Sequence, residues 1–179
     1  AGTGAQIEDF VGGIAELGDR LGALSWQFER GRAPKPGELE VFLSLLPEQA
    51  GGRRVRHALE LREPALFTPP VLALLRARNV ALVFAGSDEY PSFADVTADF
   101  VYARLMRARA GLPQGYDEAE LDAWARRAGE WAAGGDPADL PHLETPRPAQ
   151  APRDVFVFFI ASAKERNPAA ARALIDRLA

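Results

Sequence analysis

The chain has 179 residues, a length that suits one domain with a buried core. It is 47% hydrophobic and 26% charged with a net charge of −4, which disfavours a nucleic-acid or membrane-binding surface, although a local basic patch can lie within an acidic total. The absence of cysteine excludes disulfides and thiolate sites. The sequence shows no secretory signal and no apolar run of roughly 18 residues, so we expect a cytoplasmic protein.

Helical and strand patterns alternate along the chain. Apolar positions at a 3.6-residue period predict helices, and short continuous apolar runs predict strands that are buried on both faces. In chain order, the expected elements are a helix from Thr3, a strand at 22–28, a helix ending at Pro47, a strand at 55–61, a helix from Thr68, strands at 80–85 and 99–105, a helix from Asp117, a strand at 154–160 and a helix from Asn167.

Several helices have sharper local signals. The spacings of Thr3 with Gln6 and of Asp117 with Glu120 are those of capping boxes, and Pro69 follows the expected cap Thr68. The buried stripes are expected to contain Ile7, Phe10, Val11, Ile14 and Leu17 in the first helix, Leu121, Trp124, Ala128 and Trp131 in the fourth, and Ala171, Leu174, Ile175 and Leu178 in the last.

Strands that alternate with helices indicate an α/β fold with a parallel sheet. The biased segment 134–152 holds five prolines between a helix and a strand. A connection from helix to strand lies at the amino ends of parallel strands, so we place this segment opposite the strand-to-helix loops. We interpret it as a surface spacer in preference to a functional lid.

Ligands bind at the carboxyl ends of the strands in open parallel sheets and in (β/α)8 barrels alike. Here those ends supply Gln27, Glu60, Arg62 and Arg104. Charged groups at such positions need partners, and we expect Glu60 and Arg104 to bond to each other. A structural ion pair that fills the core remains the alternative interpretation.

The five strand-to-helix loops are basic. They hold eight basic residues against five acidic ones, which leaves an acidic remainder elsewhere and favours an anionic ligand. Arg107, Lys164 and Arg166 are the expected anion-binding residues, because barrels often hold phosphate at the loops after their last two strands. The residues in question are Arg30, Arg32, Lys35, Arg62, Arg107, Arg109, Lys164 and Arg166, against Glu29, Glu63, Asp88, Glu89 and Asp95. Solvated loop charges are the alternative.

Metal and cofactor chemistry has little support in the sequence. The two histidines, His57 and His142, lie in a strand and in the proline-rich segment, and neither has metal-ligand spacing. Phosphate-binding glycine motifs and the GxSxG nucleophile elbow are absent. We predict no metal site and no cofactor.

The motifs LGALSWQF…FLSLLP, RHALELREPALF, TADFVYARL, GYDEAELDAWARRAGEWA and RDVFVFF resemble the YecE-like family, domain of unknown function 72, over nearly the whole chain. The resemblance implies a TIM-type (β/α)8 barrel, of which residues 1–179 would be the C-terminal five βα units in a single domain. About three upstream units would be missing. It also implies that Gln27, Glu60, Arg62, Tyr102 and Arg104 match the family's strand-end pattern.

Several family positions differ. Glu63 replaces a histidine, Met106-Arg107 replaces a His-Gly pair, and Ala161-Ser162 replaces an asparagine-rich segment. Two histidines suited to acid–base chemistry are therefore gone. The sequence looks like an alphaproteobacterial branch of the family.

Three functional hypotheses follow. The first is an enzyme acting on an anionic, phosphorylated or carboxylated small molecule. In it, Glu60 and Arg104 are catalytic, and Gln27, Arg62, Tyr102, Arg107, Lys164 and Arg166 bind substrate. The second is a non-catalytic module that binds a metabolite or a protein at the same end of the strands. The third is a phosphodiester-cleaving barrel with metal ligands from the missing units.

Overall fold

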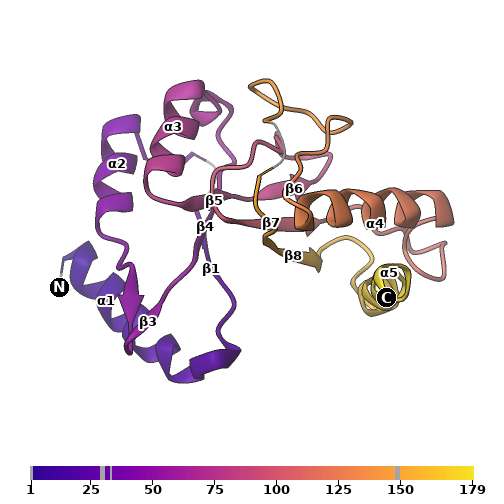
Figure 1. The fold of residues 1–179 in the computed structure, drawn as a ribbon, viewed down its shortest axis with the longest axis horizontal. Coiled ribbons are helices and arrows are strands. Elements are labelled where there is room, and N and C mark those ends of the chain that lie inside the picture. The colour runs from indigo at the N-terminus through magenta and orange to yellow at the C-terminus, as the bar shows by residue number, and fades with distance from the viewer. Residues whose placement is uncertain (1, 29–30, 33, 148–149) are drawn as a thin grey trace.

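The computed structural model describes residues 2–28, 31–32, 34–147 and 150–179. Glu29 and Arg30, which belong to the loop-charge prediction, lie outside this part of the chain. Figure 1 shows strands at the centre of the molecule, α1 to α3 on one side and α4 and α5 on the other. The helical segments are α1 (Thr3–Ile14), η1 (Ala15–Arg20), α2 (Pro36–Ser44), η2 (Pro64–Leu66), α3 (Pro69–Ala77), α4 (Glu118–Ala132), η3 (Lys164–Arg166) and α5 (Asn167–Leu178).

Parallel strands form two three-stranded sheets, with the orders β1-β4-β5 and β6-β7-β8. Val83 separates β5 from β6 and donates its N–H to the carbonyl of Leu59 at 2.9 Å, so one apolar run serves both sheets. Strands β2 and β3 form a separate, short antiparallel hairpin, which the apolar pattern did not predict. The strands are β1 (Leu24–Gln27), β2 (Gln49–Ala50), β3 (Arg53–Arg54), β4 (His57–Glu60), β5 (Val80–Leu82), β6 (Phe84–Gly86), β7 (Phe100–Leu105) and β8 (Asp154–Phe159).

The α/β class and the parallel pairing agree with the sequence, but the expected five-unit portion of a (β/α)8 barrel is wrong. Among the described residues no barrel closes, and each parallel sheet has only three strands. The barrel was implied by the family resemblance, and the βα alternation could not test it, because alternation is common to open sheets and barrels. Closure depends on strand number, tilt and shear, and none of these is written in local periodicity.

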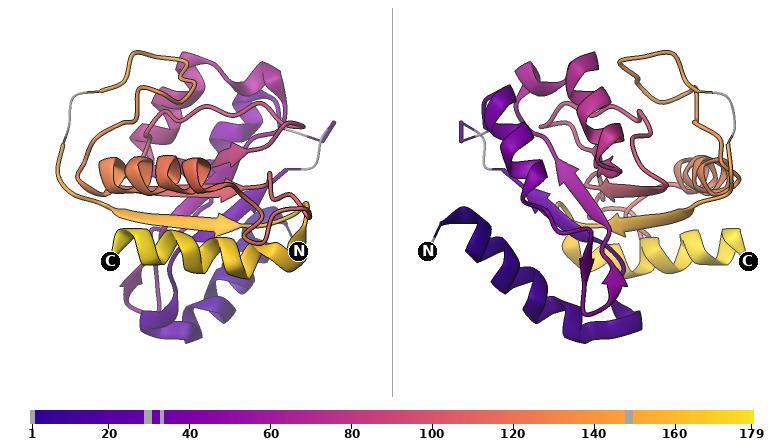
Figure 2. Two further views of the ribbon diagram at one scale, coloured as in Figure 1. Left: turned by 90° about the vertical axis from the view of Figure 1, so that its right-hand side faces the viewer. Right: turned by 60° about the vertical axis from the view of Figure 1, so that its left-hand side comes forward.

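The helix faces are partly as expected. Ile7 and Val11 are buried in α1, whereas Phe10 and Leu17 are about half exposed. In α5 the buried apolar positions are the smaller Ala170 and Ala173 together with Leu174, so the expectation that Ile175 and Leu178 would be buried is wrong. Helix α5 runs alongside β8 and contacts α4, and close contact of this kind favours small side chains (Figure 2).

The predicted helix caps are confirmed only in part. Asp117 and Glu120 form the predicted box, each accepting a hydrogen bond from the other's backbone N–H at 2.8 Å. Gly2 is the N-cap of α1, so the box expected from Thr3 is wrong. Thr68 is the N-cap of α3 and Pro69 its first residue, but the Thr68 side chain makes no capping bond. None of the helices in the described ranges is long and apolar enough to cross a membrane.

Candidate functional site

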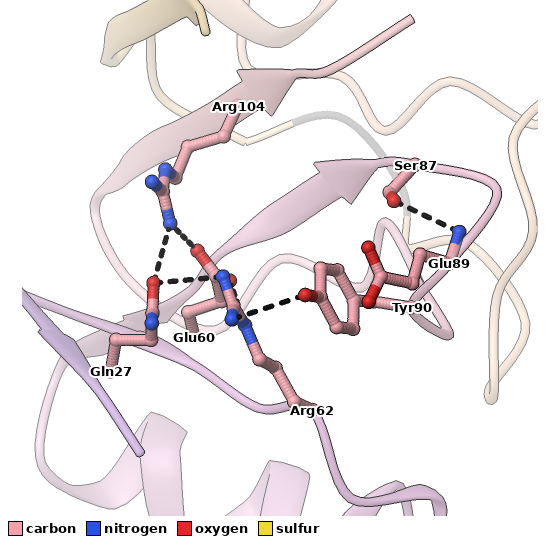
Figure 3. A network of polar contacts seen from close by, with 7 residues as sticks. All are labelled: Gln27, Glu60, Arg62, Ser87, Glu89, Tyr90 and Arg104. Carbon is pink, nitrogen blue, oxygen red and sulfur yellow. Dashed lines mark hydrogen bonds and ion pairs between the residues drawn. The ribbon is translucent and has the colours of Figure 1, made fainter. Parts of the chain in front are cut away.

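The carboxylate of Glu60 lies at the carboxyl end of β4 and is fully buried. Nε of Arg62 donates to its Oε1 at 2.7 Å, and Nη1 of Arg104 donates to its Oε2 (Figure 3). The predicted contact between Glu60 and Arg104 is confirmed. Two guanidinium groups on one carboxylate supply the charge partners that a buried anion requires.

The side-chain amide of Gln27 connects the two arginines. Gln27 is the register partner of Glu60 across β1 and β4, and its Oε1 accepts from both Arg62 and Arg104 at 3.0 Å. Residues from three strands therefore converge at one point, as predicted from the strand ends. We call Gln27, Glu60, Arg62, Tyr90 and Arg104 the Glu60 network.

Tyr90 is the member of the network that the sequence reasoning missed. The Arg62 guanidinium lies 4.1 Å from the centre of the Tyr90 ring, and its Nη1 is 3.3 Å from the phenol oxygen (Figure 3). The available signal was an aromatic residue in the loop that follows β6, within GSDEYPSF. Such a ring restricts the Arg62 side chain by a cation–π contact.

Tyr102 lies beneath the network on β7. Its ring stacks on Phe158 of β8 at 4.9 Å between centroids, and burial raises the pKa of its phenol, an effect that a hydrogen bond with Ser25 opposes. Tyr102 is only 9% exposed, and it precedes Arg104 by two residues on the same face of β7. Burial also lowers the pKa of the Arg104 guanidinium from its usual value.

A shallow cavity of about 710 Å³, wide open to solvent, lies beside Arg104, between β8 and the start of α5. Lys164 and Asn167 also line it, together with the apolar side chains of Phe158 and Ile160. Two cations and a helix N-terminus at one cavity create a positive potential there.

The turn that leads out of β8 is strained. Ala161 and Ser162 have φ values of 58° and 45°, a region that residues other than glycine rarely adopt. Ser162 donates its hydroxyl to the carbonyl of Met106 at 2.6 Å, which holds this turn against the end of β7. Strain of this kind concentrates at functional sites, and this turn adjoins the cavity beside Arg104.

The remaining predicted anion-binding residues are engaged elsewhere. Arg107 pairs with Asp88 at 2.9 Å, and Arg166 donates Nε to the carbonyl of Ala110 at 3.2 Å. Arg109 pairs with Glu120, an acidic residue of α4 that a count restricted to the loops omits. The structure therefore brings Gln27, Glu60, Arg62 and Arg104 into direct contact, with Tyr102 beneath them. Lys164 lines the adjoining cavity, whereas Arg107 and Arg166 are not among the lining residues.

Both histidines are packed groups. His57 accepts from the Trp26 indole at 3.0 Å and faces the Pro47 carbonyl at 2.8 Å, as expected for a histidine packed inside a strand. His142 lies between the Leu140 carbonyl and Asp136. In the described ranges, no three His, Asp or Glu side chains gather into a group that could hold a metal ion.

This geometry defines an α/β protein with a buried, arginine-bound glutamate at the carboxyl ends of its parallel strands. The sequence model of the family described as "Protein of unknown function DUF72" matches residues 1–179, and the chain belongs to that family. The predicted family resemblance is confirmed. No curated protein is a significant match to the sequence.

Two crystal structures of DUF72 family proteins are similar in fold. The one from Enterococcus faecalis has a TM-score of 0.69 at 17% identity, and the similarity covers 99% of this chain and 69% of that protein. The one from Thermotoga maritima has a TM-score of 0.64 at 18% identity, covering 96% of this chain and 63% of that protein. At these identities the comparison bears on the fold alone.

Proposed function

We propose that the chain binds an anionic small molecule, phosphorylated or carboxylated, in the cavity beside Arg104. The observation that carries this proposal is the fixed position of Arg104. Its Nη1 is held by Glu60 and Gln27, while the side chain also lines a cavity that contains Lys164. A pre-positioned guanidinium binds an oxyanion with little loss of conformational freedom.

The role of Glu60 separates an enzyme from a binding module. A general acid or base must present an oxygen to the substrate. Both Glu60 oxygens accept from arginines, and the side chain is 0% exposed. This arrangement favours Glu60 as a positioning residue for Arg62 and Arg104, and thus supports the non-catalytic alternative. In the enzymatic version, substrate would have to displace one arginine from the carboxylate.

The test is a thermal-shift screen of the intact protein against phosphorylated sugars, nucleotides, organic acids and divalent metals. A ligand that binds only the folded state raises the melting temperature. We expect an anionic metabolite to give a shift that Lys164→Ala abolishes. Arg172→Ala, which removes an exposed cation from α5 outside the cavity lining, should retain the shift.

If Lys164→Ala retained the full shift, the cavity beside Arg104 would not be the binding site. Where the ligand is turned over, Glu60→Gln separates the two versions of the proposal. Loss of turnover with binding retained would support a proton-transfer role for Glu60. Parallel loss of binding and turnover would support the positioning role.

A further inference from the structure

A second cavity, of about 250 Å³, lies at the opposite end of the strands from the Glu60 network. Its lining includes Asn79, Asp99 and Arg153, and each of these residues immediately precedes a strand. Arg76 of α3 and Arg147 of the proline-rich segment complete its basic wall. The cavity therefore lies at the amino ends of β5, β7 and β8.

The proline-rich segment is anchored to the fold at this end. The N–H groups of Leu143 and Glu144 donate to the Asp95 carboxylate at 2.8 and 3.0 Å. The Glu144 side chain accepts from Arg76 at 2.6 Å. A plain spacer would need none of these contacts, because loop backbone can be satisfied by water. The segment is held where it forms one wall of the cavity.

Arg153 has more donors than the fold satisfies. Its Nη2 donates to the carbonyl of Gly134, while its Nη1 is buried with no hydrogen-bond partner among the described residues. Burial lowers the pKa of this guanidinium, and the nearby charge of Asp136 opposes that effect. Arg153 therefore lines the cavity with a charge that Asp136 balances only in part and with one N–H that the fold does not satisfy.

The charges around the cavity leave an excess of cations. Asp99 pairs with Arg54 at 2.6 Å, outside the lining, and Arg76 pairs with Glu144. Arg147 is exposed and has no partner within the part of the chain that the structure describes. Arg147 and Arg153 thus face a single remaining carboxylate, that of Asp136, which His142 also contacts at 2.9 Å.

We infer that this second cavity binds a phosphate group through Arg147 and Arg153. Guanidinium groups offer paired N–H donors that match the oxygens of phosphate, and two of them complement a doubly charged group. The volume lies below the roughly 300 Å³ at which pockets for larger ligands begin, so free phosphate or a small phosphate ester fits better than a nucleotide. The site is distinct from the cavity beside Arg104.

Titration of the intact protein with inorganic phosphate, followed by calorimetry at constant ionic strength, tests the inference. We expect one saturable site, which Arg147→Ala weakens by about tenfold, the loss typical of one charge-assisted hydrogen bond. Because Arg147 is exposed, this variant should melt at the wild-type temperature in phosphate-free buffer. Arg153→Lys keeps the charge but loses the paired donors and should also weaken binding. Arg172→Ala is the matched control and should bind as wild type does.

Glycerol phosphate in place of inorganic phosphate distinguishes an ester from the free ion as the preferred ligand. The absence of saturable phosphate binding would overturn the inference. So would full phosphate binding in both Arg147→Ala and Arg153→Lys. If Lys164→Ala alone removed phosphate binding, the ion would occupy the cavity beside Arg104, and the second site would be rejected.

Discussion

Nε1 of Trp26 on β1 donates a hydrogen bond to Nδ1 of His57 on β4, with 3.0 Å between the two nitrogens. Nδ1 accepts this bond, so the proton of a neutral His57 lies on Nε2, which donates to the Pro47 carbonyl at 2.8 Å. Protonation of Nδ1 would break the bond from Trp26. Burial lowers the pKa of His57 below 6.5 and therefore also favours the neutral imidazole.

The first prediction concerns pH. A histidine whose pKa is lowered by folding takes up its proton more readily in the unfolded chain, so its contribution to stability is complete above pH 6.5 and is lost as the pH falls below that value. The loss reaches at most about 1.4 kcal/mol per pH unit. Urea unfolding at pH 7.5 and at successively lower values measures it. His57→Gln should flatten this part of the profile, and an unchanged slope would contradict the assignment.

The second prediction concerns Glu60. Glu60→Gln keeps the size of the side chain but leaves Arg62 and Arg104 without their shared anion. We expect a loss of about 3 kcal/mol in the free energy of unfolding, towards the low end for a broken buried pair because both arginines are partly exposed. Glu63→Gln, the same change three residues later, is the control and should lie within about 0.5 kcal/mol of wild type. Equal effects of the two changes would show that the network contributes little to stability.

The third prediction concerns Gly134, which has a φ of 92°. A Cβ added there would lie 2.1 Å from the carbonyl oxygen of Gln150, so the backbone would have to shift. Gly134→Ala should destabilise the fold by about 2 kcal/mol and weaken phosphate binding at the second cavity, which Gly134 lines.

Gly129→Ala is the matched control for this experiment. Gly129 lies within α4, and an added Cβ would meet nothing within 4 Å. Alanine at that helical position should raise the free energy of unfolding by about 0.5–1 kcal/mol. Urea denaturation of both variants gives the comparison. Stabilisation by both changes would contradict the close approach of the Gln150 carbonyl to Gly134.

The fourth prediction concerns the start of α4. Asp117→Ala removes the acceptor for the Glu120 N–H and should cost about 1 kcal/mol of stability. Asp176→Ala, which removes an exposed carboxylate near the end of α5, is the control and should have little effect. Thermal unfolding monitored by circular dichroism measures both. A smaller loss for Asp117→Ala than for Asp176→Ala would argue against the capping role.

The sequence by itself determined the α/β class, the parallel strands and the main helices to within a few residues, and the convergence of Gln27, Glu60 and Arg104. These features depend on local periodicity and on the rule that carboxyl ends of parallel strands meet at one edge. The capping box of Asp117 is equally local, because its two hydrogen bonds join residues three positions apart.

Only the tertiary structure decided how the strands pair and what surrounds each charge. The division into two sheets at Val83 depends on pairing between distant segments, which no local pattern encodes. Tyr90 joins Arg62 across 28 positions, and Arg153 meets Gly134 across 19. The burial of Ala170 and Ala173 in place of Ile175 follows from contact between α5 and its neighbours. Such contacts are set by packing in three dimensions, so the chemistry of both cavities was visible only after the chain was folded.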